Sequence, residues 1–229
     1  MYIKEEIDTK NISYKVYDFL IEAIIEGQLK FGEKLNIRKI ANELGISPMP
    51  VRDAINRLAN ENIVQINPRS NCRLIIPKKK YILELFEIRK VLEMFAIKKY
   101  LTSSKQKSLY KLNKLIQEMK AIRYRSGEDD ISLNDQRALI NLDTLYHREI
   151  ISLAENKEMF KIYKNISLQL NMAITYSICD FPYEKRIYMD HQMIYNYLMN
   201  GSNKAIVILK KHLEYIQEKI IRSKKLISS

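Results

Sequence analysis

The stretch from Ile46 to Val64, ISPMPVRDAINRLANENIV, constrains the fold more than any other part of the sequence. Ser47 can cap a helix there, because its hydroxyl can accept a hydrogen bond from a first-turn backbone N–H, with Met49 as the expected donor. Pro48 and Pro50 fit the first turn, where amides have no intrahelical partner. The apolar residues that follow recur on one helix face: Val51, Ala54, Ile55 and Leu58. The sequence therefore predicts an amphipathic helix packed against a core.

The opposite face of this helix carries Met49, Arg52, Asp53 and Asn56 at the same spacing. A helix in the major groove of DNA presents such side chains to base edges and phosphates. An ordinary amphipathic surface helix shows the same pattern, so the neighbouring segments decide between the two interpretations.

Two further helical patterns precede this helix. The first, capped by Asn11 or Ser13, is expected to end at Gly27, a typical glycine just past a helix terminus. Its apolar face comprises Val16, Phe19, Leu20, Ala23 and Ile24. The second runs from Ile37 to Leu44, and Gly45 makes a tight turn into the next helix. Two short helices joined by a glycine turn are typical of a helix-turn-helix.

The residues after Asn62 change to the pattern of short strands. Ile63 to Ile66 and Leu74 to Ile76 flank a turn-forming cluster, so a β-hairpin wing is expected. Arg69 and Arg73 on this wing are placed to contact phosphates or the minor groove. The net charge of the whole chain is +12, which suits a polyanionic partner, either DNA or an anionic membrane surface.

The second part of the chain reads as helices. They are expected over residues 81–101, 106–125, 133–154, 157–178, 184–199 and 203–221. The predicted fold class is mainly α, with a winged helix-turn-helix DNA-binding domain (1–76), a linker (77–80) and an all-α helical bundle (81–229). No apolar run is long enough to span a bilayer and no signal-peptide core is present, so a cytoplasmic location without membrane partners is expected.

The sequence contains three histidines, His147, His191 and His212, on three different predicted helices. Asp143 lies four residues before His147, so their side chains leave the same face of one helix. Imidazole and carboxylate ligands suit Zn²⁺, Ni²⁺ or Mn²⁺. Three unrelated histidines with core or surface roles are the alternative, because periodicity cannot show that the three helices converge.

The order and spacing of several segments resemble the GntR family of transcriptional regulators, in particular the FadR type with a C-terminal FCD domain. The segments in the first domain are IIEGQLKFGEKLN (24–36) and IANELGISPMPVRDAINRLANENIV (40–64). Those in the second domain are EIRKVLEMFA (87–96), LDTLYHREIISLAEN (142–156), DHQMIYNYLMNG (190–201) and KHL (211–213). The resemblance covers about Ser13 to Leu213.

The resemblance implies a homodimer that binds a palindromic operator in double-stranded DNA and responds to a small carboxylate effector. In the metal-containing branch of the family, Asp143, His147, His191 and His212 match the ligands of a divalent cation. Zinc is favoured here, with nickel and manganese as alternatives. Arg89 matches the arginine that pairs with the effector carboxylate, a task that suits a guanidinium; an ordinary helix-pair arginine is the alternative.

The DNA contacts of the family carry over to Arg38, Ser47, Arg52 and the wing near Asn71. Met49, Asn56 and Arg69 join this set from their positions on the helix and the wing. The chain departs from the usual family pattern at Pro48 and Met49, where the family has arginine and threonine. A common base-contacting arginine is therefore absent.

Two other functions fit parts of the sequence. A metal-free relative that responds to fatty acids or acyl-CoA requires the aspartate and the three histidines to be coincidental. A metal-dependent hydrolase could use an open coordination position. No general base accompanies the ligands in sequence, however, and the N-terminal domain would be unexplained. We therefore expect a regulator and not an enzyme.

Overall fold

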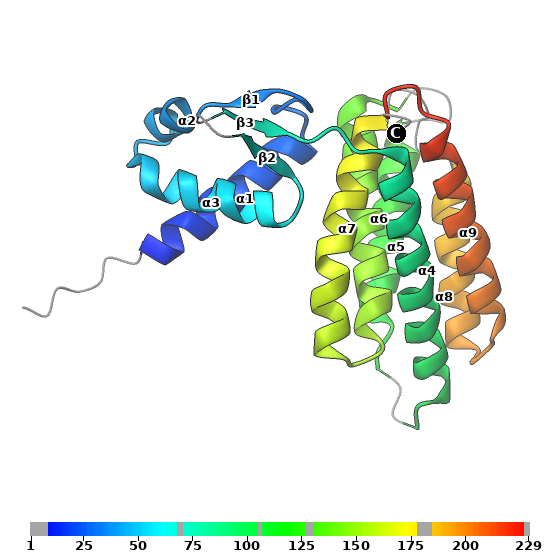
Figure 1. Cartoon of the computed structure of the whole chain (residues 1–229). Coiled ribbons are helices and arrows are strands. Elements are labelled where there is room, and N and C mark those ends of the chain that lie inside the picture. The colour runs from blue at the N-terminus through cyan, green and yellow to red at the C-terminus, as the bar shows by residue number, and fades with distance from the viewer. Residues whose placement is uncertain (1–8, 68–70, 105–106, 127–130, 178–184, 227–229) are drawn as a thin grey trace, which may run out of the picture. The chain divides into compact units, whose positions relative to one another are not determined.

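The computed structural model describes residues 9–67, 71–104, 107–126, 131–177 and 185–226. The chain divides into two compact units, Met1–Ile76 and Pro77–Ser229, shown in Figure 1. The first unit combines helices with a small sheet and the second is helical, so the expected fold class is confirmed. None of the helices in the described part of the chain is both long and apolar enough to cross a lipid bilayer.

The first unit is a winged helix-turn-helix. Its elements in chain order are α1 (Thr9–Ile25), β1 (Lys34–Leu35), α2 (Ile37–Glu43), α3 (Pro48–Asn60), β2 (Val64–Asn67) and β3 (Asn71–Leu74). The strands form an antiparallel sheet in the order β1-β3-β2. The sequence did not predict β1, because a strand of two residues has no detectable period; Leu35 pairs with Cys72 across the sheet.

The helix boundaries follow local chemistry, with two corrections. The Asn36 side chain accepts a hydrogen bond from the Lys39 N–H and caps α2, and Gly45 turns into α3 with a φ of 65°. Ser47 occupies the N-cap position of α3, but its side chain makes no capping bond. The expected bond to Met49 is therefore wrong. The predicted caps of α1 are also wrong, because that helix already includes Thr9.

The core of the first unit is formed by the inner faces of its helices and strands. All four apolar residues predicted for α3 are at most 1% exposed. Phe19 of α1 is exposed although it was expected in the core, and Tyr17 is buried. The other buried apolar residues are Val16, Leu20, Ala23, Ile24, Leu35, Ile40, Ala41, Ile63, Val64, Cys72 and Leu74. This core fixes which face of α3 remains exposed.

The second unit is a bundle of six helices joined so that successive helices run in opposite directions (Figure 1). The helices are α4 (Lys79–Thr102), α5 (Tyr110–Ser126), α6 (Leu133–Ser152), α7 (Lys157–Ser177), α8 (Lys185–Met199) and α9 (Lys204–Ile221). Helix α4 begins at Lys79, inside the segment expected to be a linker. The loop expected at residues 178–182 and the polar break at 126–130 lie almost wholly outside the described residues.

The sequence places Leu85, Ile88, Leu92, Phe95 and Ala96 on the core side of α4, and this prediction is only partly correct, since Leu85 and Ala96 are buried but other members of the set are not. Ile88 and Phe95 are 45% and 51% exposed, whereas Phe86, Arg89 and Glu93 are buried. The apolar residues of α4 occupy both sides of the helix, so periodicity could not identify the inner side. The side that carries an arginine and a glutamate is the one that packs inward, which places two ionisable groups inside the bundle.

A cluster of aromatic and charged side chains joins α1 to α3. The Arg57 guanidinium carbon lies 3.9 Å from the ring centroid of Tyr17 and 4.8 Å from that of Tyr14. The Tyr17 hydroxyl donates a 2.5 Å hydrogen bond to Glu61, whose carboxylate also lies 3.6 Å from Arg57 Nε. Burial and the bond to Glu61 raise the pKa of Tyr17, so the phenol stays protonated as a donor. Arg57 therefore braces α3 against α1.

Arg57→Ala should lower the free energy of opening of α1 and α3 by about 1 kcal/mol, through loss of the cation–π contacts and the partly exposed ion pair. Hydrogen exchange followed by mass spectrometry can measure this on peptides from the two helices. Arg52→Ala, an exposed change on the same helix, serves as the control and should leave the exchange unchanged. Equal exchange in the two variants would show that the cluster does not stabilise the unit.

Candidate functional site

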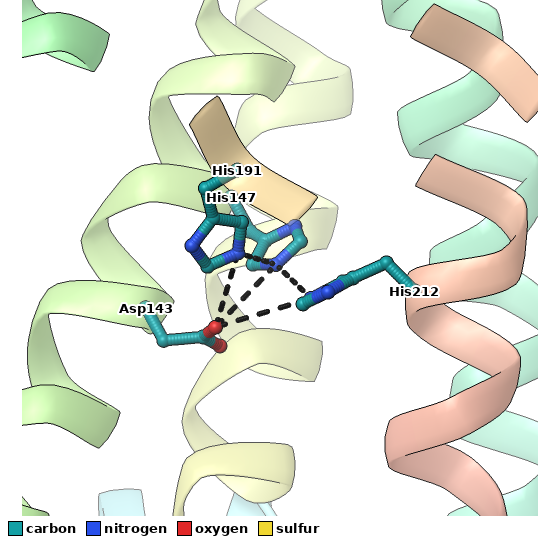
Figure 2. Close-up of side chains that lie close together, drawn as sticks. All are labelled: Asp143, His147, His191 and His212. Carbon is teal, nitrogen blue, oxygen red and sulfur yellow. Dashed lines mark hydrogen bonds and ion pairs between the residues drawn. The ribbon is translucent and has the colours of Figure 1, made fainter. Parts of the chain in front are cut away.

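The bundle brings Asp143, His147, His191 and His212 together, although they lie on three helices (Figure 2). Asp143 and His147 lie one turn apart on α6, His191 lies on α8 and His212 on α9. The three histidines are fully buried and Asp143 is 6% exposed. Their candidate ligand atoms all lie within 4.8 Å of one another.

The distances between these atoms fit one shared cation. His147 Nε2 lies 3.2 Å from His212 Nε2 and 3.3 Å from His191 Nε2. Asp143 Oδ1 lies 3.2, 3.8 and 4.0 Å from Nε2 of His191, His147 and His212, respectively. Ligands about 2.1 Å from a tetrahedral ion lie about 3.4 Å apart. The arrangement is therefore already close to that of a coordination sphere.

Two buried carboxylates select the tautomers of two of the histidines. His147 Nδ1 lies 2.6 Å from Glu93 Oε2, and His212 Nδ1 lies 3.4 Å from Asp190 Oδ2. Each imidazole then carries its proton on Nδ1 and directs the Nε2 lone pair to the centre of the cluster. Burial also lowers the pKa of His147 and His212, which keeps both rings neutral. Neutral imidazoles with converging lone pairs are metal ligands.

Asp143 supplies the negative charge of the cluster. Its Oδ1 atom is buried and accepts no hydrogen bond, although His191 Nε2 lies 3.2 Å away. A cation at the centre would satisfy this oxygen and the imidazole lone pairs together. The donor set, three nitrogens and an oxygen without sulfur, suits zinc, nickel or manganese.

Arg89 lies beside this cluster, on the buried face of α4. Its Nε donates a 2.6 Å hydrogen bond to Glu93 Oε1, which also accepts a 2.6 Å bond from the Tyr163 hydroxyl. Burial alone would lower the pKa of Arg89, but the acidic groups around it, Glu93 and Asp143 among them, raise it. The guanidinium is therefore charged. Because Glu93 engages only Nε, one of five N–H donors, the group keeps the capacity to bind a carboxylate.

The predicted DNA-contacting residues belong to the first unit. The structure describes the exposure of most of them, but only the backbone of Asn71 and nothing of Arg69. Ser47, Met49, Arg52 and Asn56 are all exposed on α3 or at its start, and Arg38 is exposed at the second residue of α2. Arg69 lies outside the described residues. The backbone of Asn71 begins β3 and pairs with Asn67. Arg73, also proposed for the wing, is exposed and donates a 3.2 Å hydrogen bond to the Gly32 carbonyl.

Sequence reasoning missed Glu93, Tyr163 and Asp190 as parts of the site. Glu93 lies four residues after Arg89, and Asp190 directly precedes His191. The spacing of four residues places Glu93 on the same helix face as Arg89, and this spacing could have identified Glu93 as a partner of the arginine. Tyr163 gave none, because a tyrosine in an apolar helix face is ordinary core.

Two family models match the sequence. The model described as bacterial regulatory proteins, gntR family, matches residues 12–74, and the FCD domain model matches residues 84–215. The two matches fall within the two compact units of the structure.

Individual proteins agree with these matches. The gluconate operon transcriptional repressor of Bacillus subtilis is 26% identical over 86% of this chain and 80% of its own length. A crystal structure of a candidate GntR transcriptional regulator from Rhodococcus sp. RHA1 has a TM-score of 0.79 at 20% identity, covering 91% of this chain and 96% of that one. Lar, described as controlling the Listeria monocytogenes agr system, has a TM-score of 0.61 at 26% identity, covering 92% and 96%.

Glu93→Gln should weaken zinc binding by about 10- to 100-fold, because an outer carboxylate of this kind orients a histidine ligand and raises its basicity. Competition with a chelator of known affinity measures the change. Glu87→Gln, an exposed substitution on the same helix, should leave the affinity unchanged. Equal zinc affinity in the two variants would show that Glu93 does not support His147 as a ligand.

Proposed function

The chain belongs to the GntR family of bacterial regulatory proteins, with a gntR-family winged helix followed by an FCD domain, and from this premise we propose that a small carboxylate bound beside a divalent metal controls its operator binding. The chain is a DNA-binding transcriptional regulator and not an enzyme. The single observation that carries the proposal is the convergence of three imidazole Nε2 atoms on the unbonded Oδ1 of Asp143.

The metal is the first step of the proposal. In a metal-free regulator, the lone pairs of these imidazoles and the Asp143 carboxylate would face one another in a buried space. A buried polar atom without a partner, such as Asp143 Oδ1, costs about 1–3 kcal/mol. A divalent cation, zinc in preference to nickel or manganese, removes this cost. This argument disfavours the alternative of a metal-free acyl-responsive relative.

The effector is the second step. We assign it to a position that bridges the metal and Arg89, where a carboxylate would meet a cation on one side and a guanidinium on the other. Glu93 holds Arg89 and also contacts His147, a proposed metal ligand. One side chain therefore positions both the guanidinium and a ligand of the metal. Sugar acids are good candidates, because a relative of this chain is named for the gluconate operon.

The response to the effector is the third step. A ligand that contacts α4 through Arg89 and α6, α8 and α9 through the metal stabilises one arrangement of these four helices. It shifts the population toward that arrangement by its difference in affinity. Because α4 is also the helix that follows the winged helix in the chain, its position can set the spacing of two DNA-binding units.

Dimerisation through α4 completes the proposal. Ile88, Val91 and Phe95 form an exposed apolar stripe on this helix, with Val91 69% exposed. Ile162 on α7 is also exposed, and it precedes Tyr163, whose hydroxyl reaches Glu93 on α4. An apolar face of this kind on a helical bundle is typical of an interface. A second copy of the chain is the occupant that a palindromic operator requires.

A thermal-shift screen against mono-, di- and tricarboxylates and sugar acids tests the effector site. An effector present at a concentration about 100 times its dissociation constant should stabilise the metal-loaded protein by about 2.7 kcal/mol. The stabilisation should disappear in Arg89→Lys, which keeps the charge but loses the planar fork, and in His191→Ala, which loses a metal ligand. A carboxylate that stabilises all three proteins equally would place the effector elsewhere.

Phe95→Glu should convert the dimer to a monomer, because it places a charge in the apolar stripe of α4. Val207→Glu is the matched control, since Val207 is an equally exposed apolar residue, at 52%, on α9. Sedimentation velocity measures the oligomeric state of both variants. A Phe95→Glu protein that sediments as the wild type does would exclude this face as the interface.

A further inference from the structure

The recognition helix begins with an apolar tip. Its first three residues are Pro48, Met49 and Pro50, and Pro50 is buried in the core. The Met49 side chain is 64% exposed, more than any other large apolar side chain in residues 9–67 and 71–76. Exposing a long apolar side chain to water is unfavourable, and a partner that covers the side chain removes this cost.

This tip is a poor site for a phosphate. The first turn of a helix normally binds anions through its unpaired N–H groups. Pro48 and Pro50 have no N–H, so the first three residues of α3 offer only that of Met49. The Ser47 hydroxyl makes no capping bond either. The chemistry at the start of α3 therefore favours an apolar partner over a charged one.

Met49 belongs to a ridge of exposed side chains on a firmly held helix. Met49, Arg52 and Asn56 follow one another at i, i+3 and i+7 along the exposed face. The opposite face is locked by Val51 and Leu58, which are fully buried. The ridge therefore cannot rotate without exposing the core.

From this ridge we infer that Met49 reads the C5-methyl group of a thymine in the major groove. A recognition helix places its N-terminal residues against base edges, and thymine presents there the one apolar group that an unmodified base pair offers. The flexible thioether of methionine adapts well to such a methyl group. The inference rests on the DNA-binding role of α3 and adds the identity of one base that this helix contacts.

The spacing of the ridge gives the neighbouring contacts. Arg52 lies about 4.5 Å and Asn56 about 10.5 Å along the helix axis from Met49. Residues about one turn apart on a recognition helix reach neighbouring base pairs, so Arg52 falls beside the thymine and Asn56 further along the same half-site. Arginine pairs with guanine and asparagine with adenine in the major groove. Each operator half-site should therefore contain this thymine within a few base pairs of a guanine and an adenine.

The test begins with operators selected by the full-length protein from a pool of randomised duplexes. Each thymine of one half-site is then replaced by deoxyuridine, which removes only the methyl group. At one position this change should weaken wild-type binding about fourfold, as expected for one buried methyl group. Met49→Ala should bind the thymine and deoxyuridine operators equally. Met49→Leu should regain part of the preference.

Asn56→Ala is the control, because it alters the same ridge and should keep the full preference for thymine. The inference is overturned if no thymine is sensitive in the wild type, or if Met49→Ala keeps the sensitivity. Failure of the pool to yield any preferred duplex would instead contradict DNA recognition as a whole. Failure of the carboxylate screen would contradict effector control and leave the thymine contact standing.

Discussion

The helical unit depends on one buried carboxylate, that of Glu93. It accepts hydrogen bonds of 2.6 Å from Arg89 and Tyr163 and lies 2.6 Å from His147 Nδ1. These contacts join α4 to α6 and α7 inside the bundle. Burial raises the pKa of Glu93, and Arg89 and Tyr163 oppose that rise. Such a fully buried carboxylate is stabilised only by its partners, so each partner is held in a single orientation.

This constraint couples the proposed metal site to the proposed effector site. Glu93 fixes the His147 tautomer that points a lone pair at the metal position, and it also holds the Arg89 guanidinium. A ligand that draws Arg89 toward itself therefore also acts on Glu93, the carboxylate that supports His147. The two sites share one hydrogen-bonded group and need no longer path between them.

The DNA-binding unit uses a different kind of constraint, which is apolar packing. The buried stripe of α3 and the Arg57 cluster fix the helix against α1. Arg57 is a basic residue of the predicted recognition helix, but its guanidinium lies over two tyrosine rings and beside Glu61. The side chains left on the outer ridge of α3 are those that DNA can meet.

The sequence by itself determined the two-part helical organisation, the helix-turn-helix and the bounds of most helices. Glycine turns and a strong 3.6-residue period act locally, so a linear sequence contains them. It also paired Asp143 with His147, because four residues separate neighbours on one helix face. The helices of His191 and His212 are separate in sequence, and periodicity could not bring them together.

Only the tertiary structure decided which face of α4 is buried. Apolar residues lie on both sides of that helix, and packing against α6, α7 and α9 selected the side with Arg89 and Glu93. The exposure of Ile88 and Phe95 follows from the same choice. The supporting roles of Glu93, Tyr163 and Asp190 likewise arise from contacts between helices distant in the chain. Such contacts depend on the helix arrangement, which no local pattern encodes.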